Sequence, residues 1–140
     1  MSNDIMRREM IEAVQAGERA LVSLRSAEEV LNSARNWGIV DMIGGGFIST
    51  LMKQSKMQRA VSCMEQAKTD LMRFANELQD VNIPMNLNMD VGGFLSFADF
   101  FFDGFVADFL VQSKISDAKT QVANAIAYVE QALYRLRVNL

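Results

Sequence analysis

The chain has 140 residues, half of them hydrophobic, with a single Pro, a single Cys and no His. This length and apolar content suffice for a core, and we expect residues 1–140 to form a single helical domain. Without His, Ser-His and Cys-His nucleophile pairs and the usual zinc sites are excluded, so any enzyme chemistry would rest on carboxylates. A net charge of −3, with Lys and Arg scattered, argues against a nucleic-acid partner.

Three stretches repeat apolar and small residues in steps of three and four, which predicts amphipathic helices. We expect an all-α bundle of four main helices over about 4–36, 38–81, 94–111 and 114–138, with a kink or break in the second at Gly44 to Gly46 or at Ser55. Small residues in the first stretch predict close approach of a neighbouring helix. The three stretches, called seams below, are Met10, Ala13, Gly17, Ala20, Leu24, Ala27, Leu31, Ala34; Met57, Ala60, Met64, Ala67, Leu71, Phe74, Leu78, Val81; and Ile115, Ala118, Val122, Ala125, Val129, Ala132, Leu136.

A linker from Asn82 to Gly93 separates the second helix from the third. Pro84 biases the preceding residue away from helix, so the second helix should stop near Val81. Asn86, Asn88, Gly92 and Gly93 are predicted turn residues.

Two parts of the chain are similar to each other: residues 37–78 align without a gap with residues 95–136. Nine aligned pairs are identical, where about three are expected by chance. They include Asp41 with Asp99 and the run 54–56 with 112–114. We interpret this as an internal duplication in which a short apolar segment precedes an amphipathic helix. A kink or a turn at Ser55 would join the two parts.

The run Gly44, Gly45 and Gly46 follows Trp37 and Asp41. A glycine run can form an anion-binding nest, but the strand and the Lys-Ser/Thr end of a phosphate loop are missing. We favour a close-packing contact or a hinge. If rings from 100–102 pack on the glycines, Gly45→Leu should destabilise the fold by about 1 to 3 kcal/mol.

Trp37, Asp41, Gly44 to Gly46 and Lys56, followed by the segment ADFFFDGFVADF, resemble a group of uncharacterised bacterial helical proteins. The resemblance covers about residues 30–120. The group has no established activity, so the resemblance implies only a small bacterial cytoplasmic helical protein. The polar amino terminus, without the apolar stretch of a secretory signal, also favours the cytoplasm.

Asp41, Asp99 and Asp103 lie in the most apolar parts of the chain and are the candidate metal ligands. We favour solvent-facing carboxylates, and expect no metal or other cofactor.

Two more acidic pairs, Glu9 with Glu12 and Glu77 with Asp80, have the one-turn spacing with which all-α nucleotide pyrophosphohydrolases hold magnesium. Such pairs are common on solvated helices, and no cluster of Lys and Arg accompanies them. Cys63 is in helical register with small and apolar neighbours, and we expect it to be a half-buried packing residue.

The stretch from Val91 to Val111 is long enough for a membrane span, but Asp99, Asp103 and Asp108 argue against a simple transmembrane helix. A hairpin of the two apolar segments that inserts as an assembly stays open as an alternative.

The leading prediction is a non-enzymatic helical scaffold or partner-binding protein that self-associates, because its apolar segments exceed what one small bundle needs. The other alternative is a carboxylate-based divalent-metal or nucleotide-handling enzyme.

Overall fold

The computed structural model describes residues 2–44, 47–100 and 115–140, and places the side chains of residues 4–32, 59, 62–100 and 118–140. Four helices form in these ranges: α1 (Ser2–Gly44), α2 (Phe47–Asn82), α3 (Val91–Phe100) and α5 (Ile115–Val138). The predicted all-α fold of about four helices is confirmed.

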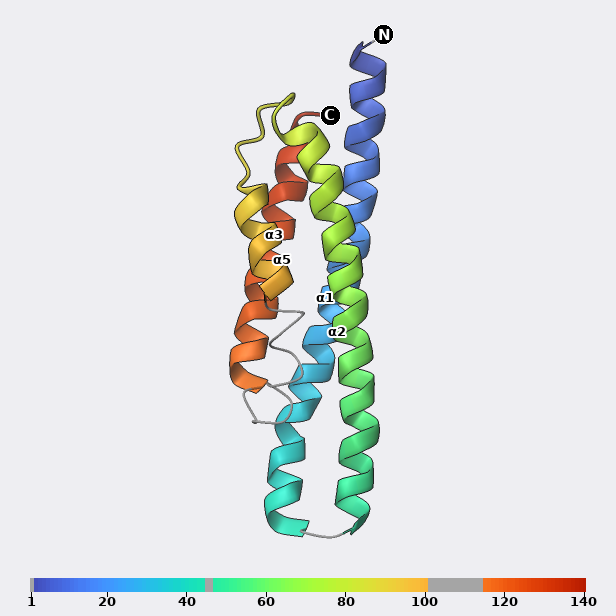
Figure 1. Cartoon of the computed structure of the whole chain (residues 1–140), viewed down its shortest axis with the longest axis vertical. Coiled ribbons are helices and arrows are strands. Elements are labelled where there is room, and N and C mark those ends of the chain that lie inside the picture. The colour runs from blue at the N-terminus through green and yellow to red at the C-terminus, as the bar shows by residue number, and fades with distance from the viewer. Residues whose placement is uncertain (1, 45–46, 101–114) are drawn as a thin grey trace.

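The longest helices, α1 and α2, form an antiparallel hairpin (Figure 1). Against it, α5 packs on α1 and the short α3 packs on α2. The end of α1 and the start of α2 lie well past the first turn of α5 (Figure 1). Within the described residues, one end of the molecule is therefore a three-helix bundle with an added short helix, and the other end is built from α1 and α2.

The predicted seams lie in the core. Every seam residue whose side chain is described is buried, with Phe74, Leu24, Leu71 and Leu136 among the largest. Ala34, Met57, Ala60 and Ile115 lie outside the described side chains. Burial at alternating steps of three and four on α1, α2 and α5 is how three amphipathic helices share one core.

Gly17 marks the closest approach of these helices. A Cβ atom at this position would lie 2.7 Å from Leu133 Cδ2 and 2.9 Å from Phe74 Cε1. Both side chains are fully buried, so neither has room to move. The glycine therefore lets α2 and α5 approach the backbone of α1, as the small residues of its seam predict.

The linker between α2 and α3 is a folded loop. The Asn82 side chain donates a hydrogen bond to the Met89 carbonyl at 2.9 Å and accepts one from the Met89 amide at 3.0 Å. These two hydrogen bonds close the loop. Asn86 and Asn88 adopt positive φ angles of 52° and 58°, as expected of turn residues. Leu87 and Met89 turn inward and are buried.

The structure corrects the predicted start of the third helix. Gly92 and Gly93 belong to the first turn of α3 and not to the linker. The reason is the Asp90 carboxylate, which accepts a hydrogen bond from the Gly93 amide at 3.0 Å and so caps the N-terminus of the helix. The remainder of the predicted third helix, after Phe100, lies outside the described residues.

The predicted boundary between the first two helices was also wrong. α1 does not stop at Asn36 but continues to Gly44, because the isolated Gly38 costs a helix only about 1 kcal/mol. The helix boundary falls at the glycine run, which is one of the two positions predicted for a kink or break. Gly45 and Gly46 themselves lie outside the described residues. α2 passes through Ser55 without interruption, so Ser55 is not a turn.

The two copies of the predicted duplication are helical wherever the structure describes them. The first copy occupies the end of α1 and most of α2, and the second occupies α3 and α5. Since residues 101–114 of the second copy are outside the described residues, the superposition of the copies stays a prediction.

Candidate functional sites

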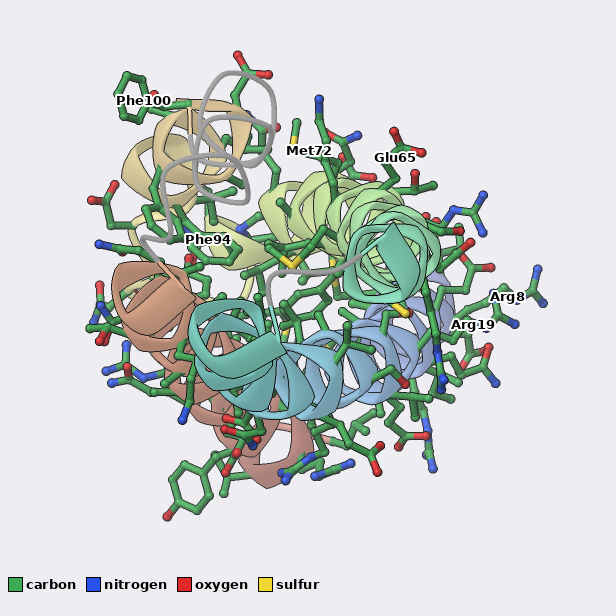
Figure 2. All side chains as sticks on the ribbon, turned by 90° about the horizontal axis from the view of Figure 1, so that it is seen from below. Arg8, Arg19, Glu65, Met72, Phe94 and Phe100 are labelled. Carbon is green, nitrogen blue, oxygen red and sulfur yellow. The ribbon has the colours of Figure 1, made fainter. Side chains whose placement is uncertain are left out.

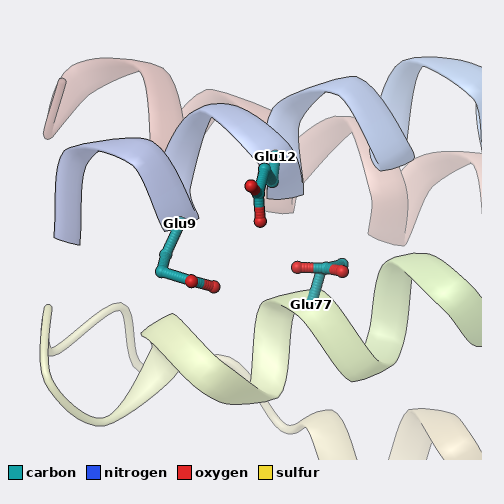
Figure 3. A group of neighbouring side chains, drawn as sticks. All are labelled: Glu9, Glu12 and Glu77. Carbon is teal, nitrogen blue, oxygen red and sulfur yellow. The ribbon is translucent and has the colours of Figure 1, made fainter. Parts of the chain in front are cut away.

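Glu9 and Glu12 on α1 meet Glu77 on α2 (Figure 3). Their nearest carboxylate oxygens all lie within 4.8 Å of one another. The residues at 9 and 12 share one face of α1, and the antiparallel hairpin brings Glu77 opposite them. The fold thus brings the pair Glu9 and Glu12 together with Glu77 of the second acidic pair. Asp80, the other member of that pair, is not part of the cluster.

Repulsion within this cluster has an electrostatic consequence at Glu77. Partial burial raises the pKa of its carboxyl above the usual value, and the charges of Glu12, Glu9 and Asp80 raise it further. Arg73 acts in the opposite direction. Ionisation of Glu77 is therefore less favourable in the folded protein than in the unfolded chain.

The predicted candidate metal ligands are placed only in part. Asp99 is exposed on α3, as expected of a solvent-facing carboxylate. Asp41 belongs to α1, but its side chain is not described, and Asp103 lies outside the described residues. Cys63 is half-buried, as predicted.

A shallow groove of about 570 Å³ follows the contact between α1 and α2. Ser23, a buried polar residue of the core, donates to the Asp70 carboxylate at its floor. Gln66 donates to the same carboxylate at 3.1 Å. Arg19 lines the rim and points outward (Figure 2). The polar groups at the floor are thus paired with each other across the two helices.

An aromatic and polar junction joins α3 to α5. The rings of Phe94 and Tyr128 stack with centroids 3.8 Å apart and planes 9° apart. The Tyr128 hydroxyl donates to the Asp90 carbonyl at 3.1 Å. Burial and the nearby Asp90 charge raise the pKa of Tyr128 to about 12. Arg135 of α5 donates to the carbonyls of Leu87 at 2.6 Å and Asn88 at 2.9 Å. The junction fixes the loop and α3 against α5.

The end of the described part of α3 exposes one large apolar side chain. Phe100 has 76% of its surface accessible, and its ring points away from the helices (Figure 2). On the same helix Phe94 is buried, and Leu95 and Phe97 pack partly buried against the core. The apolar surplus of this segment is visible in the sequence, but the sequence does not indicate which residue lies outside.

The described helices define an all-α fold, and the carboxylate cluster and the groove on them do not define a known kind of site. Comparison with protein-family models, with curated proteins and with solved structures finds no match to this chain. Among the described helices, none is long and apolar enough to cross a membrane.

Proposed function

We propose that this protein is a non-enzymatic helical scaffold that binds protein partners, first of all further copies of itself. The observation that carries the proposal is Phe100, a large aromatic side chain that is 76% exposed at the end of an apolar helix. Aromatic side chains are enriched in protein interfaces, where they bury large areas at a small cost in side-chain entropy. A contact made by α3 would remove this surface from water.

The rest of the molecule fits a scaffold. α1 and α5 are held together by exposed ion pairs, Arg25 with Glu130 at 3.1 Å and Arg137 with Glu18 at 3.0 Å, in addition to the apolar core. A packed helical bundle presents its surface residues at fixed spacing. The resemblance to bacterial helical proteins supports the bacterial cytoplasm as its location.

Light scattering across a concentration series tests the proposal. We expect the chain to form dimers or larger assemblies at micromolar concentration, and Phe100→Ser to shift the assembly toward monomer. Tyr134→Ser on α5 is the matched control, because Tyr134 is an aromatic residue with 67% exposure on another helix. A monomer at all concentrations, or equal effects of the two substitutions, would contradict the proposal.

The second candidate is a carboxylate enzyme that uses a divalent cation, and the observation that favours it is the meeting of Glu9, Glu12 and Glu77. Carboxylate oxygens are the ligands that magnesium prefers. Exposed acidic groups also gather without a metal, so the scaffold ranks first. A rise of the melting temperature with millimolar Mg²⁺ or Mn²⁺ that Glu77→Gln abolishes would reverse this ranking.

A further inference from the structure

The end of the hairpin combines an apolar stretch with a set of basic residues. We use "hairpin end" for residues 35–44 of α1 and 47–59 of α2. From Trp37 to Met52 the only charged residue is Asp41. Four basic residues flank this stretch in the sequence: Arg35 before it, and Lys53, Lys56 and Arg59 after it. The hairpin end thus carries an excess of positive charge, whereas the whole chain has a net charge of −3.

The pairing of α1 with α2 brings the basic residues to nearly one level. The hydrogen bond between Ser23 and Asp70 fixes which residues of the two helices lie opposite, and the bend between Gly44 and Phe47 agrees with that register. Counting along both helices from this pair places Lys56 level with Trp37, and Arg35 within one residue of the level of Arg59. Lys53 is about one turn nearer the bend.

Apolar positions surround much of α1 in this part. Residues 37, 39, 40, 42 and 43 are Trp, Ile, Val, Met and Ile. At 100° per residue they occupy an arc of about 220°, more than the stripe of about 100° with which a helix faces its neighbours. Among the described elements, only α2 runs beside α1 up to the bend (Figure 1).

We propose that the hairpin end docks on an anionic lipid bilayer, with residues 38–44 and 47–52 entering one leaflet and the basic residues at the headgroups. The dimensions match. Trp37 precedes Gly44 by seven residues, or about 10 Å of helix, and half of a bilayer's hydrocarbon core is about 15 Å thick. Trp prefers the headgroup level, and Lys and Arg there attract anionic lipids.

The single acidic residue is compatible with shallow docking. The register places Asp41 within about one residue of the level of Lys53 on the other helix. The penalty for a carboxylate is greatest at the bilayer centre and falls toward the interface. Insertion of the hairpin end into one leaflet needs no membrane-spanning helix. The inference uses a different part of the molecule from α3, so it does not depend on the proposed self-association.

Fluorescence of the unmodified chain is the first test, because Trp37 is its only Trp. Vesicles of equal parts phosphatidylcholine and phosphatidylglycerol should shift the emission of Trp37 to shorter wavelength, and vesicles of phosphatidylcholine alone should do so much less. High salt should weaken the response, because it screens the attraction. No shift with the anionic vesicles would overturn the proposal, and so would an equal shift with both vesicles.

Vesicle flotation of charge-reversal variants is the second test. Each basic residue near an anionic surface contributes about a fivefold gain in binding, so Lys53→Glu with Lys56→Glu should weaken flotation by roughly 25-fold or more. Arg7→Glu with Arg8→Glu is the matched control, since these exposed residues lie at the other end of α1. Circular dichroism verifies that both variants fold. Equal loss in the two variants, or flotation unchanged by the first, would overturn the proposal. Association of the chain through the hairpin end without vesicle binding would also overturn it.

Discussion

Gly17 fits its position in α1 because it has no side chain. It lies where α1 meets both Phe74 of α2 and Leu133 of α5, at distances that leave no space for a methyl group. A glycine inside a helix costs about 1 kcal/mol relative to alanine. The close approach of three helices, and the apolar burial that follows from it, offsets this cost.

Substitution of Gly17 by Ala should therefore destabilise the protein, by up to about 2 kcal/mol, because overpacking outweighs the gain in helix propensity. Urea denaturation followed by circular dichroism measures the change. Gly92→Ala is the control, because a Cβ atom at Gly92 meets nothing within 4 Å. We expect the control to be neutral or slightly stabilising. Equal stabilities of the Gly17→Ala variant and the unmodified chain would show that the helices separate without cost.

Glu77 is a residue whose charge opposes folding. Its pKa is raised in the folded protein by burial and by the neighbouring carboxylates, so the folded state binds the proton more tightly than the unfolded state does. Stability from this group is thus fully present below the unfolded pKa and is lost as pH rises through the folded pKa.

Replacement of Glu77 by Gln should stabilise the protein at pH 7 by about 0.2 to 0.5 kcal/mol, a small value because solvent screens the repulsion. The gain should shrink as pH falls, since the unmodified Glu77 then becomes protonated, and it should also shrink in high salt. Melting curves over a pH series measure it, with the exposed Glu29→Gln as control. A gain independent of pH would mean that repulsion is not its origin.

At the scale of elements, the sequence predicts helices well and their contacts poorly. The three seams are confirmed as the core because burial along a helix follows a local period. The end of α1 and the start of α3 were placed wrongly, since one depends on a weak penalty at Gly38 and the other on the capping carboxylate of Asp90. The cluster of Glu9, Glu12 and Glu77 depends on the register between two helices, which no local pattern sets.

The loop between α2 and α3 should depend on Asn82. Asn82→Ala removes a donor and an acceptor that both pair with the backbone of Met89. Leaving these partly buried groups unpaired should cost about 1 to 3 kcal/mol. Chemical denaturation measures this, with Asn124→Ala on the exposed face of α5 as control. If both variants unfold at the same denaturant concentration, the loop is held by Arg135 and Tyr128 without Asn82.

The whole molecule joins a tightly packed region to two apolar regions at its periphery. α1, α2 and α5 bury their seams fully. The end of α3 carries an exposed aromatic side chain, and the hairpin continues beyond α5 (Figure 1). Such an arrangement separates stability, which resides in the seams, from recognition, which we assign to the periphery. Substitutions at the periphery should therefore change association without unfolding the chain.

Hydrogen exchange of the full chain at low and high protein concentration tests whether the protein self-associates through α3. Backbone amides of Val91–Phe100 should exchange more slowly at high concentration, because the contact covers them. Amides in the middle of α5, from Val122 to Leu133, should exchange equally at both concentrations, because they already belong to the core. Exchange of α3 that does not change with concentration would contradict self-association through this helix.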